Sequence, residues 1–217
     1  KENSDENELR AYLDNFNELL NREDKGARSI SKISIQTGTS HGGVPGPDGK
    51  VVEVNLDFEC LENLSRIARQ DYGLAGAVQH GASTLPRDLF NKFPELETAE
   101  IHLATDFQNM IYDNELFPED FKKEIYVHLR KKFASEKKET DTDEQFIYKT
   151  RKKGFGEFKS KFWELSNEIR TEIGSHLQKK VEHLFTQLKV EDTLEVTKRT
   201  TPLVKVLPNL AQEIASE

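Results

Sequence analysis

The chain has 217 residues, of which 35% are hydrophobic and 32% charged, and its formal net charge is −8. This length is enough for one hydrophobic core and a smaller appendage. The acidic balance argues against nucleic acid as a partner, and no apolar run reaches transmembrane length, so we also expect no membrane partner. The single cysteine, Cys60, cannot form an internal disulfide, which predicts a protein of the reducing cytoplasm.

The first half of the chain alternates between predicted helices and strands. Apolar spacing predicts strands at residues 32–37, 74–79 and 99–104. It predicts helices at 8–20, at 58–72 (capped by Asp57), at 86–93 and from 106. Turn residues predict a glycine- and proline-rich loop without regular structure at 39–50. Strand, helix, strand is the βαβ unit of a parallel sheet. The sequence therefore predicts an α/β fold with three parallel strands.

The second half is predicted to be helical. A helix is expected at residues 118–133, followed by a charged, mobile loop at 135–143. The longest predicted helix covers residues 157–188, with apolar side chains at spacings of three and four. Periodicity alone leaves two interpretations open, an outer helix that covers a core or a dimerisation helix. The tail after residue 190 is expected to dock in an extended form.

Two histidines follow predicted strands, and each is followed by glycine. His41 comes after the first strand and His80 after the second. The carboxyl ends of parallel strands meet at one edge of a sheet, so both imidazoles are expected in one space. Imidazole is a common zinc ligand, and a catalytic zinc takes about three protein ligands. The alternative is that each histidine only forms hydrogen bonds within its loop.

Small residues near the same strand ends are suited to bind phosphate, because glycine lets backbone N–H groups approach an anion closely. The residues with this character are Gly42, Gly81, Ala82, Ser83 and Thr105. As an isolated signal for phosphate, this pattern has little specificity.

Three motifs together resemble a known family. They are residues 40–43 (SHGG), 79–83 (QHGAS) and 101–106 (IHLATD). In order and spacing, from about residue 33 to residue 108, they look like the last three strand-end motifs of the class II, zinc-dependent fructose- and tagatose-bisphosphate aldolases. The resemblance implies a TIM (β/α)₈ barrel, of which this chain supplies roughly the carboxyl-terminal half plus extra C-terminal helices.

The resemblance also implies roles for individual residues. It makes His41 and His80 ligands of Zn²⁺, and it places Gly42, Gly81, Ser83 and Thr105 around a substrate phosphate. His102 stands where the family has an asparagine that contacts the substrate. Lys161 falls near the position of an arginine that a neighbouring subunit sends towards the phosphate. The remaining zinc ligand and the catalytic acid of the family lie on earlier strands, so no catalytic residue is expected in this chain.

The implied function is metal-dependent aldol cleavage or condensation of a phosphorylated ketose, a lyase activity of carbohydrate metabolism such as glycolysis. In that family, zinc polarises the ketose carbonyl. Two alternatives remain open: a catalytically silent aldolase-like subunit that supports a partner enzyme, or another metal-dependent lyase or epimerase on the same barrel. A silent subunit need not hold zinc, so metal content distinguishes it from the other two.

The expected organisation has three parts. Residues 1–112 form the barrel half, residues 113–190 a helical extension that closes the barrel and offers a subunit interface, and residues 191–217 a tail. Three parallel strands leave two open edges, which favours association. We therefore expect an amino-terminal barrel half to complete the fold, and a homo-oligomer such as a dimer.

Overall fold

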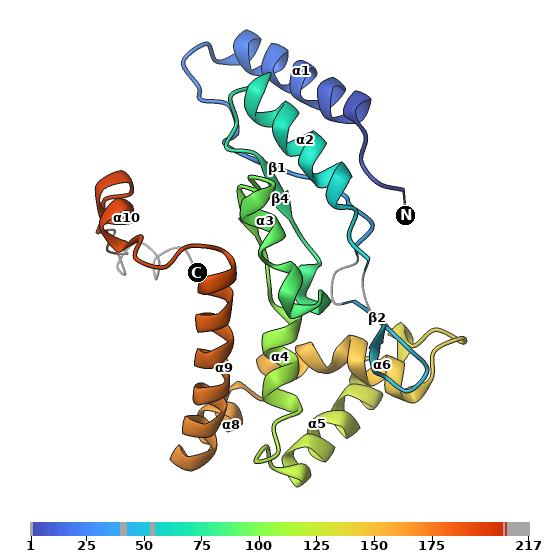
Figure 1. Ribbon diagram of the computed structural model, residues 1–217. Coiled ribbons are helices and arrows are strands. Elements are labelled where there is room, and N and C mark those ends of the chain that lie inside the picture. Colours follow the sequence, from blue (N-terminus) through green and yellow to red (C-terminus); the bar gives the residue numbers. More distant parts are fainter. Residues whose placement is uncertain (1, 40–42, 53–54, 206, 208–217) are drawn as a thin grey trace.

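The computed structural model describes residues 2–39, 43–52, 55–205 and 207. Within them the protein is mixed α/β, with helices around a small parallel sheet (Figure 1). The strands of this sheet, in spatial order, are β1 (Ile33–Ser34), β4 (Ala77–Gln79) and β5 (Glu100–Ile101). Both pairings are parallel, which confirms the predicted arrangement, although each strand is shorter than predicted.

The described helices, in chain order, are α1 (Glu6–Glu23), α2 (Phe58–Gln70), α3 (Lys92–Glu95), α4 (Thr105–Tyr112), α5 (Glu119–Lys132), α6 (Asp143–Thr150), α7 (Gly154–Glu157), α8 (Lys159–Trp163), α9 (Asn167–Gln187) and α10 (Leu194–Thr200). Short 3-10 turns lie at η1 (Ala82–Thr84), η2 (Arg87–Leu89), η3 (Ala134–Glu136) and η4 (Arg151–Lys153). Among the residues described, no helix combines the length and the apolar character needed to cross a bilayer.

The sheet and α2 form the first core. The Asp57 side chain accepts a hydrogen bond of 2.9 Å from the backbone N–H of Cys60, which fixes the start of α2 as predicted. The buried positions of α2 repeat at spacings of three and four, and this apolar stripe packs on β4. They are Leu61, Leu64, Ile67 and Ala68. Helix α1 covers α2 with Leu9 and Leu13 (Figure 1).

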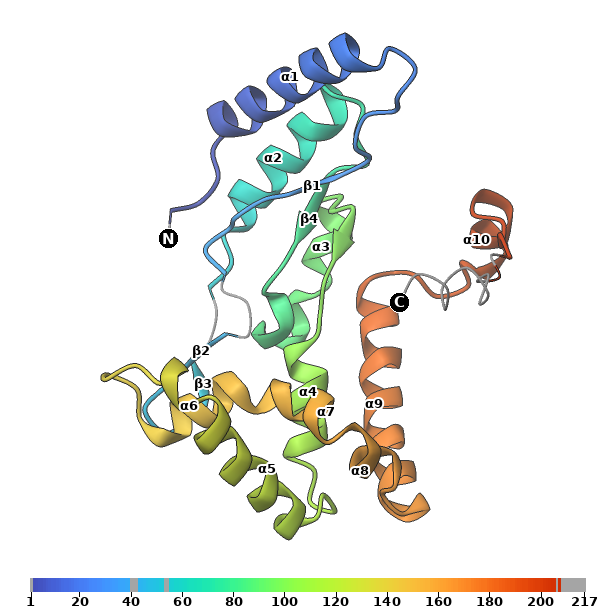
Figure 2. The same cartoon turned by 180° about the vertical axis from the view of Figure 1, so that it is seen from behind.

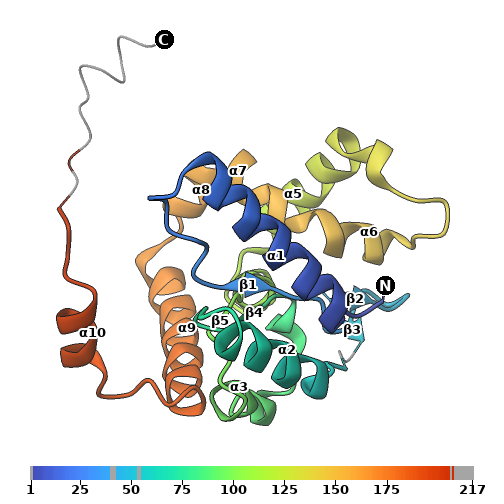
Figure 3. The same ribbon diagram turned by 90° about the horizontal axis from the view of Figure 1, so that it is seen from above.

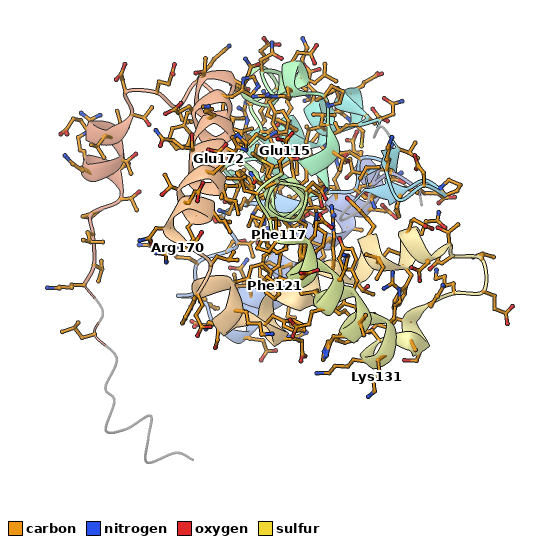
Figure 4. The ribbon with its side chains drawn as sticks, turned by 90° about the horizontal axis from the view of Figure 1, so that it is seen from below. Glu115, Phe117, Phe121, Lys131, Arg170 and Glu172 are labelled. Carbon is orange, nitrogen blue, oxygen red and sulfur yellow. The ribbon has the colours of Figure 1, made fainter. Side chains whose placement is uncertain are left out.

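A second, largely aromatic core lies beneath the sheet, between α4, α5, α6 and the start of α9. Its fully buried centre is Tyr112, whose hydroxyl donates a hydrogen bond of 2.8 Å to the carbonyl of Arg151. Phe117 and Phe121 stack with ring centroids 5.6 Å apart, and Figure 4 shows them side by side near the lower end of α4. Offset aromatic pairs of this kind add to the stability that burial alone provides.

Helix α9 connects the two cores. Its residue Ile173 packs in the aromatic core, whereas Leu184, three turns later, packs in the core of the sheet. Between them the buried ammonium of Lys180 lies 2.6 Å from the carboxylate of Asp106 on α4. Figure 2 shows α9 running along α4, and Figures 2 and 3 show α10 standing away from the body. The helical extension is therefore packed against the sheet and not appended to it.

The prediction of one continuous helix over residues 157–188 is wrong. The structure has three helices there, α7, α8 and α9, with a break before Asn167. Ser166 caps α9, because its hydroxyl accepts a hydrogen bond from the backbone N–H of Ile169. The apolar spacing continues across the break, so periodicity does not reveal it.

The structure adds to three segments predicted without regular structure. The loop predicted at 39–50 contains β2 (Val44–Pro45), which pairs antiparallel with β3 (Val51–Val52) just after it. In the segment at 135–143, which is expected to be a mobile loop, Asp141 accepts a hydrogen bond of 2.6 Å from Lys149. The tail forms α10, and Leu203 beyond it is 96% exposed, so the expected docking does not occur within the described residues.

Gly154 is required where α7 crosses the aromatic core. A Cβ atom at this position would lie 2.5 Å from the Tyr112 hydroxyl and 2.8 Å from Ile125 Cγ2. We expect Gly154→Ala to lower the free energy of unfolding by about 1–3 kcal/mol, because the core is already close-packed. The measurement is urea denaturation monitored by circular dichroism.

Gly156, in the same helix, is the matched control, because a Cβ atom there meets nothing within 4 Å. Gly156→Ala should leave stability unchanged or raise it by up to about 1 kcal/mol. Equal unfolding midpoints for the two variants would contradict the packing described around Gly154.

Candidate functional site

A cavity of about 700 Å³ lies at the carboxyl ends of β4 and β5. Its walls come from the end of β4, from β5 and the residues after it, from the start of α4 and from η4. The lining residues are His80, Gly81, Ser83, Glu100, Ile101, His102, Leu103, Ala104, Thr105, Gln108 and Lys152. This is the edge of a parallel sheet at which ligands bind in α/β folds.

The two histidines of the cavity lie against each other. His80 follows β4, and its ring Nδ1 is 3.1 Å from the Ser34 hydroxyl of β1. His102 follows β5, and its ring centroid lies 4.4 Å from that of His80, at an interplanar angle of 68°. The parallel pairing of the strands thus brings together two imidazoles that are 22 residues apart in the chain.

A carboxylate orients His102. The Glu100 side chain contacts His102 Nε2 through one oxygen and the Lys32 ammonium through the other. The hydrogen bond from Lys32, and after it the hydrogen bond from His102, hold the pKa of Glu100 below its ordinary value. Glu100 is therefore an ionised acceptor. Because Nε2 of His102 faces Glu100, the other ring nitrogen, Nδ1, points away from that carboxylate.

The turn after His80 contacts the start of α4. Gly81 has φ of +72°, a left-handed conformation that glycine adopts without strain, and it opens the turn η1. The Ser83 hydroxyl accepts a hydrogen bond of 3.1 Å from the backbone N–H of Ala104. Thr105 is the first residue of α4, and the first N–H groups of a helix lack partners within it. The cavity is therefore bordered by a helix N-terminus, which favours an anion.

Among the described residues that line the cavity, Lys152 is the one lysine or arginine, and no sequence motif points to it. It lies on η4, next to Arg151, whose buried guanidinium makes a bidentate ion pair with Asp113 at 2.7 and 3.1 Å. Arg151 also donates to the side chain of Asn109 on α4. This anchor fixes η4 to α4, so that Lys152 and Thr105 line the same cavity.

A buried polar network supports the end of β4. The Gln79 side chain is fully buried, accepts a hydrogen bond of 2.8 Å from the Thr37 hydroxyl and donates to the Thr39 hydroxyl at 3.1 Å. Its amide also donates to the carbonyl of His80. These bonds tie the residues after β1 to the backbone of His80, so they fix the position from which its side chain projects.

The structure brings together His80, Gly81, Ser83, His102 and Thr105 of the predicted site residues. Ala82 is fully buried in η1 and does not line the cavity. Lys161 lies on α8, where it pairs with Glu124 at 2.7 Å; it is not among the residues that line the cavity. His41 and Gly42 fall outside the described residues.

Within the described residues, no group of three or more His, Cys, Asp or Glu side chains is placed to hold a metal ion. His80 and His102 provide two imidazoles, but the carboxylate nearest to them, Glu100, is engaged by Lys32 and His102. A catalytic zinc site takes about three protein ligands. The described residues alone therefore do not fit a complete zinc site.

Comparison with known proteins gives no family: no family model matches the chain, and no curated protein matches it. The resemblance to class II aldolases thus depends on the three motifs. Two of these motifs, at residues 79–83 and 101–106, meet at the cavity.

Removal of the polar group of Gln79 tests the network behind His80. We expect Gln79→Leu, which nearly conserves volume, to lower the free energy of unfolding by about 1–3 kcal/mol, because the buried Thr37 hydroxyl loses the acceptor of its hydrogen bond. The control is Gln70→Leu on the exposed side of α2, expected to change stability by less than about 0.5 kcal/mol. Equal destabilisation by the two variants, measured by urea denaturation, would contradict the role of the network.

Proposed function

We propose that this chain is part of a class II aldolase-like enzyme, which cleaves or forms a phosphorylated ketose by an aldol reaction. The observation that carries the proposal is the convergence of His80, Ser83, His102 and Thr105 on one cavity at the carboxyl ends of parallel strands. These residues come from two motifs that are separate in the sequence.

One end of the cavity is suited to the phosphate of the substrate. Lys152 contributes an ammonium group, Ser83 and Thr105 contribute hydroxyls, and α4 contributes its N-terminus. These are the donors that bind phosphate in proteins. Gly81 allows a close approach, since it carries no Cβ atom. In this proposal, these residues bind and orient the substrate and take no part in proton transfer.

The end of the cavity that carries His80 and His102 would receive the reacting part of the substrate. In the proposed enzyme, zinc would be held by His80 and His41 with a further ligand from outside this sequence, and it would supply Lewis-acid chemistry. Glu100 fixes the ring of His102, so His102 would orient a polar group of the ketose through its other nitrogen.

The proposed fold of the intact enzyme is the (β/α)₈ barrel. Within the described residues, β1 and β5 each pair with β4 alone, so each has an edge on which a further strand can add. Strands of an amino-terminal barrel half would pair with these edges. The proposed enzyme is a homo-oligomer, in which Lys161 of a neighbouring subunit would approach the phosphate.

A catalytically silent aldolase-like subunit is the second candidate. Two observations favour it: His102 stands where the family has an asparagine, and the described residues do not complete a metal site. Such a subunit would retain the cavity, support a partner enzyme and bind no zinc.

Lys152 is expected to contribute to phosphate binding. We expect Lys152→Met to raise the KM for a phosphorylated ketose about tenfold or more, since a lost charge-assisted hydrogen bond costs about 1.5–3 kcal/mol. Lys153→Met is the control: it removes the same charge from the next residue, whose ammonium pairs with Glu136. Steady-state kinetics of the intact enzyme measures both, and an equal change in KM would contradict the assignment.

His80→Ala tests the metal assignment. In the intact protein we expect it to abolish zinc binding and aldol cleavage together, because it removes a ligand that neighbouring contacts do not replace. Zinc is measured by atomic absorption after dialysis, and folding is checked by circular dichroism. Stoichiometric zinc in a folded His80→Ala protein would exclude His80 as a ligand, whereas a folded wild-type protein without zinc would support the silent subunit.

A further inference from the structure

The hairpin of β2 and β3 lies against α6 (Figures 1 and 2). At its base, a Cβ atom on Gly43 would lie 3.0 Å from the Thr84 side chain, so the hairpin touches η1 beside Ser83. At its tip, a Cβ atom on Gly49 would lie 3.0 Å from the Cβ of Glu144 in the first turn of α6. A displacement of the hairpin would therefore reach the wall that carries Ser83.

Two side chains at the start of α6 hold the hairpin. The amide Nε2 of Gln145 donates a hydrogen bond of 2.9 Å to the carbonyl of Pro45, and the Thr142 hydroxyl donates one of 2.8 Å to the carbonyl of Pro47. The same two residues form the capping box of α6. Gln145 Oε1 accepts from the backbone N–H of Thr142 at 3.0 Å, and the Thr142 hydroxyl accepts from the N–H of Gln145 at 3.1 Å.

The other end of the same segment reaches the cavity directly. After α6 the chain enters η4, where Arg151 is anchored to Asp113 and Lys152 lines the cavity. One continuous segment therefore holds the hairpin at its start and presents the cation at its end. The end of the segment lines the cavity itself, whereas its start acts on the cavity through the hairpin and the contact of Gly43 with Thr84.

We propose that Gln145 is a positioning residue for the phosphate-binding cavity. Its two side-chain atoms have separate tasks: Oε1 caps α6, and Nε2 holds the hairpin against the helix so that η1 and Ser83 keep their place. This inference rests on the proposed function for its consequence in binding, but the clamp itself does not depend on it.

The division of tasks allows a substitution that breaks one contact and keeps the other. Gln145→Glu retains the oxygen that accepts from Thr142, and a carboxylate is favoured in the first turn of a helix. It loses the N–H group that Pro45 requires and places a negative charge against that carbonyl. Gln70→Glu on α2 adds the same charge at an exposed position and serves as control.

The first measurement is hydrogen exchange in the intact protein. The amides of Gly46 and Gly49 are bonded within the hairpin, to the carbonyls of Lys50 and Gly46 respectively, and act as reporters. In Gln145→Glu we expect both to exchange about tenfold faster, while the amides within α6 keep their rates. Thr142→Ser preserves all four bonds of the clamp and should exchange like the wild type.

The second measurement is calorimetric titration with dihydroxyacetone phosphate, a simple phosphorylated ketose. We expect Gln145→Glu to raise its Kd about fivefold or more, while the Kd of Gln70→Glu stays within twofold of the wild type. Unchanged hairpin exchange in Gln145→Glu, or faster exchange with unchanged Kd, would overturn the positioning role. If the wild-type protein does not bind dihydroxyacetone phosphate, both the proposed function and the positioning role are refuted. In that case, faster hairpin exchange in Gln145→Glu would establish only that Gln145 holds the hairpin.

Discussion

The parallel pairing of β4 with both of its neighbours is the constraint on which the site depends. It brings the carboxyl ends of β1, β4 and β5 to one edge, so that His80 contacts both Ser34 and His102 although the three are distant in the sequence. Short strands of two or three residues supply few ladder hydrogen bonds. The buried side chain of Gln79 adds hydrogen bonds to Thr37, Thr39 and the backbone of His80. These bonds fix the residues that follow β1 and β4, beyond the ladder itself.

A second constraint joins the sheet to the aromatic core. Helix α4 starts at the cavity and ends in the core around Tyr112, and two buried cations hold it from either side. Lys180 of α9 pairs with Asp106, and Arg151 of η4 pairs with Asp113. In each pair the cation is buried and the carboxylate is partly exposed, so removal of the carboxylate would leave a buried charge without its partner. The position of Lys152 in the cavity follows from the second pair.

The sequence contains enough information for the strand-end residues and too little for the residues that reach the cavity from the helical half. His80, Ser83 and Thr105 could be selected because alternation of strand and helix implies a parallel sheet, whose carboxyl ends meet. Lys152 could not, since its place depends on the Arg151–Asp113 pair, which no periodicity encodes. The hairpin at Val44–Pro45 was hidden by glycine and proline, and its carbonyls find partners in Thr142 and Gln145, far along the chain. The break before α9 was hidden because the apolar spacing continues through Ser166.

The charges of the cavity also restrict how a ligand can lie in it. Along the direction of β5, Glu100 and His102 come first and Thr105 with the N-terminus of α4 comes after them. The charge of Glu100 near the strand is already matched by Lys32, whereas Lys152 and the N-terminus of α4 favour an anionic group at their end of the cavity. In the proposed enzyme, a substrate with one phosphate and a neutral polar end would therefore lie with its phosphate towards α4 and its polar end towards the two histidines. Since Glu100 belongs to the sheet and Lys152 to the helical half, this orientation depends on the packing of both cores against α4.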